Sequence, residues 1–133
     1  MPRDTEKILK RVAARLFTLP VEDYLTSEKF SDFCRKYDLF DAWKEYLVLS
    51  QDKPDLYGSA VTKNAFVLFL HHIYHSRSKE FPELFSLFLI DFSQEIPCVV
   101  PVDDLKKDLM ELGYSETEID NKLSNVKGMN PAP

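Results

Sequence analysis

Hydrophobic residues recur at intervals of three and four over most of the chain, the spacing of a helix that buries one side. The clearest case follows Thr5, where the apolar positions form one stripe and basic residues lie opposite it. Asp4 or Thr5 is placed to cap this helix, and Pro20 is placed to stop it. The stripe consists of Ile8, Leu9, Val12, Ala13, Leu16 and Phe17.

Two further helical segments follow before the first obvious loop. Ser27 is a suitable cap for a helix that carries Phe30 and Phe33, and Asp38 should break or bend it. The apolar residues of 39–49 then either continue this helix or start a new one. Residues 50–58 contain Pro and Gly at turn positions and predict a surface loop.

The most apolar part of the chain lies in two consecutive helices. The first starts near Ser59 or Thr62 and runs to about His75 or Arg77, and Pro82 suits the first turn of the second. Apolar residues surround much of both helices, as expected for elements buried at the centre of a protein. We therefore predict that Phe66–Ile73 and Leu84–Phe92 form the core pair.

The C-terminal part is marked by clear helix boundaries. Two prolines bracket residues 98–100, which indicates an extended connector or a short edge strand. Asp103 is placed to cap the next helix, and Gly113 fits the left-handed position that ends helices. Ser115 with Glu118 matches a capping box that opens a short final helix.

These patterns predict an all-α fold: a single compact bundle of about six or seven helices that ends in a short helix-turn-helix pair. The 133 residues match the usual size of one domain. Only three glycines are present, too few for the tight turns of a β-sandwich or barrel. We expect residues 1–128 to form the domain and residues 129–133 to be a frayed tail.

The net charge of −5 is unevenly distributed along the chain. Residues 1–20 carry five basic and two acidic side chains, whereas residues 83–133 carry four basic and ten acidic ones. Most of the protein should therefore repel nucleic acid and anionic membranes. No signal peptide precedes Cys34 and Cys98, and His71 interrupts the densest apolar run, so we expect two reduced thiols, no transmembrane segment and a cytoplasmic location.

Recognisable catalytic motifs are missing from the sequence. There is no Gly-x-Ser-x-Gly nucleophile motif, and the few glycines provide no phosphate-binding loop. We therefore expect no enzymatic activity and no cofactor.

The three histidines lie within five residues of one another, which provides one alternative function. His71 and His75 are one helical turn apart on the same face, the spacing by which two imidazoles share a metal ion. Asp91, an acid in an otherwise apolar helix, is the candidate third ligand. A metal-binding helical protein is thus one hypothesis. The other interpretations are a polar flank of a buried helix, with a histidine bonded to a carbonyl group or to Asp91, and a pH-sensitive contact.

The C-terminal helical pair provides two further hypotheses. Leu109–Ser115 resembles the first loop of ubiquitin-associated domains, where a Met-Gly-Phe/Tyr turn contacts ubiquitin, although Leu112 stands where that family prefers Met. The same pair resembles that of a winged-helix protein, which implies DNA binding with help from Lys106, Lys107 and Lys122. Three acids on its second helix would face the phosphates, which makes DNA binding unfavourable.

The leading hypothesis is a protein-protein interaction or regulatory domain. The first helix is basic and the last two are acidic, and aromatic residues exceed what one helical stripe can bury. A protein partner is therefore expected, and a homodimer that shares Trp43 and Tyr46 is one concrete form. The candidate interaction residues are Lys7, Lys10, Arg11, Arg15, Trp43 and Tyr46.

Overall fold

The computed structural model describes residues 4–52, 61–124 and 126, and this part of the chain folds into eight helices. The all-α fold is therefore confirmed. The expected tail, residues 129–133, and residues 53–58 of the expected loop lie outside the described residues. The helices are α1 (Thr5–Leu16), α2 (Val21–Leu25), α3 (Glu28–Lys36), α4 (Phe40–Asp52), α5 (Val61–Ser76), α6 (Phe81–Glu95), α7 (Val102–Leu112) and α8 (Glu116–Leu123).

The number of helices exceeds the predicted six or seven because of α2, which has only five residues. Its apolar residues Val21, Tyr24 and Leu25 are all buried, so packing against the core compensates for its short length. Pro20 therefore separates two helices and does not simply stop the first. The prediction of a loop over residues 50–58 was also wrong for residues 50–52, which belong to the last turn of α4.

Local capping signals confirm most of the predicted helix boundaries. The Asp4 side chain accepts a hydrogen bond from the Lys7 amide at 3.0 Å, and Ser115 accepts one from the Glu118 amide at 3.1 Å. Gly113 has a φ of 113° and ends α7 as expected.

Asp38 lies two residues beyond the end of α3 and adopts the left-handed conformation, with a φ of 61°. Aspartate adopts this conformation more readily than most residues, and it lets the Leu39 amide donate to the Cys34 carbonyl at 2.7 Å. The chain then starts a new helix at Phe40, which settles the alternative left open by the sequence.

The predicted cap of α7 was wrong. The helix begins at Val102, and Pro101 occupies the capping position without a side-chain hydrogen bond. Asp103 lies instead in the first turn, where a carboxylate still interacts favourably with the helix dipole.

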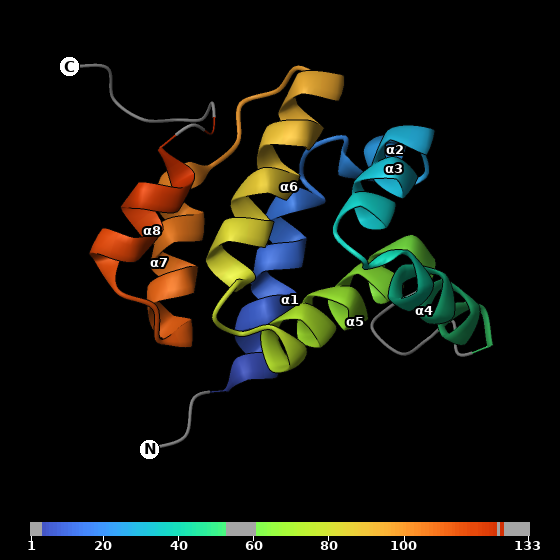
Figure 1. Cartoon of the computed structure of the whole chain (residues 1–133), viewed down its shortest axis with the longest axis horizontal. Coiled ribbons are helices and arrows are strands. Elements are labelled where there is room, and N and C mark those ends of the chain that lie inside the picture. Colours follow the sequence, from blue (N-terminus) through green and yellow to red (C-terminus); the bar gives the residue numbers. More distant parts are fainter. Residues whose placement is uncertain (1–3, 53–60, 125, 127–133) are drawn as a thin grey trace.

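The helices pack into one bundle with a pair at each end (Figure 1). On one side, α7 and α8 pack together, with α7 against α1 and α8 against α6. On the other side, α4 lies along α5, and α5 also crosses α1. The short α2 and α3 cover α6. No helix of the described residues is both long and apolar enough to cross a membrane.

The core is built mainly of aromatic rings, and Phe30 lies at its centre. Its ring centroid is 5.0 Å from that of Trp43, 5.7 Å from that of Phe69 and 5.7 Å from that of Phe88. All three contacts are edge-to-face, the arrangement that the charge distribution of aromatic rings favours. Phe30 thus joins α3 to α4, α5 and α6 at once.

The predicted core pair is buried along most of both segments. The two helices meet through ring contacts, with the centroids of Phe66 and Phe88 5.4 Å apart. The closer neighbour of α5 along its length is α4.

Replacing Phe30 with Ala should lower the free energy of unfolding by about 3–5 kcal/mol, because the cavity would remove its ring contacts to α4, α5 and α6. Phe40→Ala provides the matched control, because Phe40 is only half-buried and should cost far less. Urea denaturation followed by circular dichroism measures both. Equal losses for the two variants would contradict the central position of Phe30.

Candidate functional site

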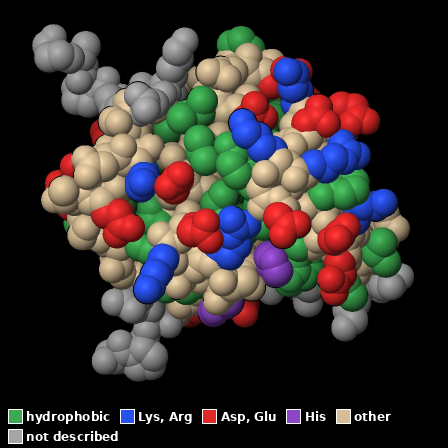
Figure 2. Space-filling model, viewed as in Figure 1, with side chains coloured by type: hydrophobic (Ala, Val, Ile, Leu, Met, Phe, Trp, Pro, Cys, Tyr) green, Lys and Arg blue, Asp and Glu red, His purple; other side chains and the backbone are tan. Residues whose placement is uncertain are grey.

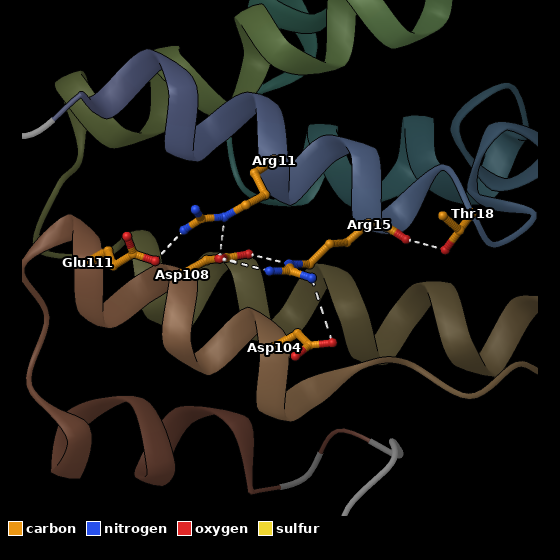
Figure 3. A network of polar contacts seen from close by, with 6 residues as sticks. All are labelled: Arg11, Arg15, Thr18, Asp104, Asp108 and Glu111. Atoms are coloured by element: carbon orange, nitrogen blue, oxygen red, sulfur yellow. Dashed lines mark hydrogen bonds and ion pairs between the residues drawn. The ribbon is translucent and has the colours of Figure 1, made fainter.

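Two arginines of α1 converge on one buried carboxylate of α7 (Figure 3). Arg11 donates from Nε to Asp108 Oδ1 at 2.8 Å, and Arg15 donates from Nε to Asp108 Oδ2 at 2.7 Å. The Asp108 side chain is only 1% exposed, whereas those of Arg11 and Arg15 are 36% and 31% exposed. Both carboxylate oxygens are thus satisfied, as a buried charge requires.

Two more acids of α7 complete this cluster at its rim. Glu111 pairs with Arg11, and Asp104 lies 3.6 Å from Arg15. The hydrogen bond to Asp108 raises the pKa of Arg15, and the charges of Asp108, Asp104 and Glu111 add to this effect. We call Arg11, Arg15, Asp104, Asp108 and Glu111 the α1–α7 clasp.

The α1–α7 clasp uses two of the four basic residues that were predicted to form an interaction surface. Arg11 and Arg15 bind acids of the same chain, although they were expected to face a partner. Lys10 pairs with Glu6 at 3.1 Å on the surface, and Lys7 is exposed.

Trp43 and Tyr46 also make contacts within the chain. Trp43 is only 3% exposed and packs between Phe30 and Phe69, with ring centroids at 5.0 and 5.5 Å. Tyr46 is half-buried, and its hydroxyl lies 3.2 Å from Nδ1 of His72, within hydrogen-bonding distance. The structure therefore places Trp43 in the core and Tyr46 in the contact between α4 and α5.

The structure brings His71 and His75 together but leaves Asp91 elsewhere. The two rings are stacked with centroids 5.6 Å apart, as expected for residues one turn apart. Asp91 accepts a hydrogen bond from the Tyr24 hydroxyl instead. Within residues 4–52, 61–124 and 126, no three His, Cys, Asp or Glu side chains are arranged to hold a metal ion. The proposed three-ligand set is therefore not assembled.

His71 lies in a surrounding that disfavours its charged form. Its Nε2 is buried and has no hydrogen-bond partner among the described residues. Burial lowers its pKa below the usual value, and the nearby His75 and Lys10 lower it further, while Glu6 opposes them. His71 therefore favours the neutral state at neutral pH.

The C-terminal pair directs its distinctive residues inward. Leu112 is 2% exposed, and the Tyr114 hydroxyl donates to the Ser78 carbonyl at 2.5 Å. Tyr114 also stacks on Phe81, with ring centroids 6.1 Å apart. The loop that resembles a ubiquitin-contacting turn therefore packs against the turn before α6 and the first residue of that helix.

Two of the three lysines considered for DNA binding are in ion pairs with acids. Lys106 lies 2.8 Å from Asp120 and 3.1 Å from Glu116, and Lys122 lies 3.2 Å from Glu83. These acids belong to the chain itself, so they compete with phosphate for the same cations.

A groove between α3 and α6 is the candidate site that the sequence reasoning missed. It has a volume of about 280 Å³ and lies between two helical faces. Its apolar lining comes from Phe33, Tyr37, Leu87 and Ile90, and most of these side chains are only half-buried. Hydrophobic side chains are visible over α6 in Figure 2, with charged side chains beside them. Its polar lining consists of Lys29, Asp32, Lys36, Asp91 and Gln94.

The carboxylates of the groove already have partners within the chain. Asp91 is bonded to Tyr24, and burial together with this hydrogen bond raises the pKa of Tyr24 far above its usual value, so its proton stays in place. Asp32 accepts a hydrogen bond from Arg35 at 3.0 Å. By contrast, Lys29 and Lys36 form no ion pair within the described part of the chain, although Lys36 lies over the Tyr37 ring at 5.5 Å.

A sequence signal for this groove existed in the positions of α3. Lys29, Phe33 and Lys36 recur at helical spacing, so they share one face of that helix. The face of α6 that lies opposite could not be identified from the sequence, because most positions in the central part of that helix, Leu84–Phe92, are apolar.

Replacing Asp108 with Ala should lower the free energy of unfolding by about 3 kcal/mol. Removing one partner of a buried ion pair costs about 3–5 kcal/mol, and the partly exposed arginines place the loss at the lower end. Asp104→Ala is the control, because Asp104 is half-exposed and its ion pair should contribute less than about 1 kcal/mol. Urea denaturation of the two variants tests this difference, and coincident midpoints would refute it.

The free energy of unfolding should decrease as the pH is lowered, and His71 should account for part of this decrease. Since its pKa is lower in the folded chain than in the unfolded chain, the unfolded chain takes up the proton first as the pH falls. The stabilising contribution is full above about pH 6.5 and is lost as the pH falls through the folded pKa. His71→Gln should therefore show a shallower decline in unfolding free energy between pH 7 and pH 5, measured by urea titrations. His75→Gln, which removes only the neighbouring charge, should show a smaller change, and curves parallel to wild type for both variants would exclude this role.

Comparison with known proteins finds no matching family model, no similar characterised protein and no similar solved structure.

Proposed function

We propose that this chain is a non-enzymatic protein-interaction or regulatory domain that holds a partner protein in the groove between α3 and α6. The groove itself carries this proposal, because it combines a half-buried apolar floor with a charged rim. Protein interfaces commonly have this organisation, with an apolar centre surrounded by polar groups.

The aromatic part of the groove supports this interpretation. Phe33 and Tyr37 lie with ring centroids 4.8 Å apart, and Phe33 also packs against Phe88 of the core at 6.2 Å. The floor is thus supported from below by the core, while Tyr37 remains half-buried at the surface. Aromatic side chains held in this way provide large contact areas with little loss of conformational entropy.

The homodimer expected from the sequence stays a prediction. Because Trp43 is 3% exposed, a second copy could share it only if the core of α3, α4 and α5 opened. Tyr46 is accessible only in part. Sedimentation of dilute protein as a clean monomer would exclude the homodimer.

We also propose a cytoplasmic location, which the two cysteines support. Cys34 and Cys98 are both free thiols. Burial raises the pKa of the Cys34 thiol to about 12, so it stays protonated and unreactive in the core. Targeting of a fluorescent fusion to another compartment would contradict this location.

The interaction proposal is tested by placing a photo-cross-linking amino acid at Leu87, within the groove. Irradiation in an extract of the source cells should give a specific adduct, because a bound partner would lie against this side chain. A second variant carries the same probe at Asn121, an exposed position on α8. This control separates the groove from the C-terminal helical pair.

The adduct at Leu87 should disappear when Ile90 is also replaced by Glu, which adds a charge to the groove floor. Circular dichroism would establish that this variant is folded. Failure to form an adduct at Leu87, or identical adducts at Leu87 and Asn121, would refute the proposed function.

A further inference from the structure

We infer that the occupant of the α3–α6 groove is an amphipathic helix with two acidic residues seven positions apart and two apolar residues between them. This inference rests on the proposed function and names the chemistry of its partner. It is carried by the spacing of the groove residues and by the unpaired charge along α3.

The groove is lined by matching stripes on its two helices. On α3 the lining residues are separated by three, four and seven positions, from Lys29 to Lys36. On α6 the same separations run from Leu87 to Gln94. Each stripe therefore covers two helical turns, about 10 Å at 1.5 Å per residue. A third helix laid along the groove would present its own side chains at these intervals.

The charges along α3 select an acidic occupant. Lys29 and Lys36 stand at the two ends of the stripe and make no ion pair within residues 4–52, 61–124 and 126. Asp32 lies between them, but Arg35 binds its carboxylate at 3.0 Å. On the opposite wall, Asp91 receives the Tyr24 hydroxyl. Two carboxylates of a partner would therefore find two lysines at the rim that form no ion pair within the described residues, one of them, Lys36, lying over the Tyr37 ring.

The apolar floor determines what must lie between the two acids. Phe33 lies between Lys29 and Lys36 on α3, and Leu87 and Ile90 provide the apolar lining of α6, so the partner should carry apolar residues at the third and fourth positions after its first acid. The motif is thus acid-x-x-apolar-apolar-x-x-acid. All of these positions fall on one helical face.

The backbone of the groove favours a helix over an extended strand. Both walls are helices, whose amides and carbonyls are bonded internally, so no sheet edge is present to pair with an extended peptide. A helix satisfies its own backbone hydrogen bonds and needs only side-chain contacts. Nucleic acid fits poorly, because Asp32 and Asp91 line the groove and the whole chain carries a net charge of −5.

The test uses a displayed library of 20-residue, alanine-rich helical peptides, randomised at four positions spaced i, i+3, i+4 and i+7. This length allows the peptides to populate a helix in water. Selection on the full chain should enrich Asp or Glu at the outer positions and Leu, Ile, Met or Phe at the inner positions. The same selection is run on the double variant K29E/K36E, whose substitutions lie at exposed positions of α3.

The double variant should reverse the preference at the outer positions to Lys or Arg. A single enriched acidic peptide should bind K29E/K36E at least about fivefold more weakly than wild type in fluorescence anisotropy, since two exposed ion pairs are lost. The Lys-containing counterpart of that peptide should bind the variant more tightly than wild type. The variant's circular dichroism spectrum serves as the folding control.

Enrichment without acids, enrichment that is unchanged on K29E/K36E, or no enrichment at all would overturn this inference. The Leu87 cross-linking experiment tests the proposed function independently of this peptide selection. If the Leu87 probe still gives its specific adduct, the groove binds a partner of another chemistry. If that adduct is absent as well, both proposals fail.

Discussion

The packing of α7 against α1 depends on the pairing of buried Asp108 with Arg11 and Arg15. A carboxylate that is 1% exposed is tolerated only when its charge is compensated, and here two guanidinium groups approach both of its oxygens. The cost of leaving it unpaired favours one rotation of α7 about its own axis. Burial of Leu105, Leu109 and Leu112, each at most 2% exposed, favours the same rotation, so the ion pair and the apolar face act together.

The clasp also explains why the charge pattern of the sequence was informative but incomplete. A basic first helix and an acidic C-terminal part were evident from the residues alone. Their mutual pairing was not, because Arg11 and Asp108 are 97 positions apart and no local pattern links them. Likewise, the sequence placed Trp43 among the apolar residues of a helix, but it did not show whether the ring is buried. The packing of α3 and α5 around the ring shows that it is.

What could be predicted was set by short-range physics. The Ser115 cap, the left-handed Gly113 and the break at Asp38 depend on a few neighbouring residues, and these predictions were confirmed. The five-residue α2 escaped prediction because its helical state depends on tertiary burial. The groove escaped for the same reason, since it exists only where α3 and α6 meet.

The two sets of cations in this chain differ in chemistry as well as in position. The arginines of α1 hold planar, forked contacts to a buried carboxylate, a geometry that lysine cannot reproduce. The cations at the rim of the groove, Lys29 and Lys36, are exposed lysines, whose flexible point charges suit the attraction and orientation of a partner more than tight binding. Arg11 and Arg15 therefore stabilise the bundle, whereas Lys29 and Lys36 form no ion pair within the described residues. In the proposed complex, affinity should accordingly depend on the apolar residues Phe33, Leu87 and Ile90, and the lysines should determine which helix binds.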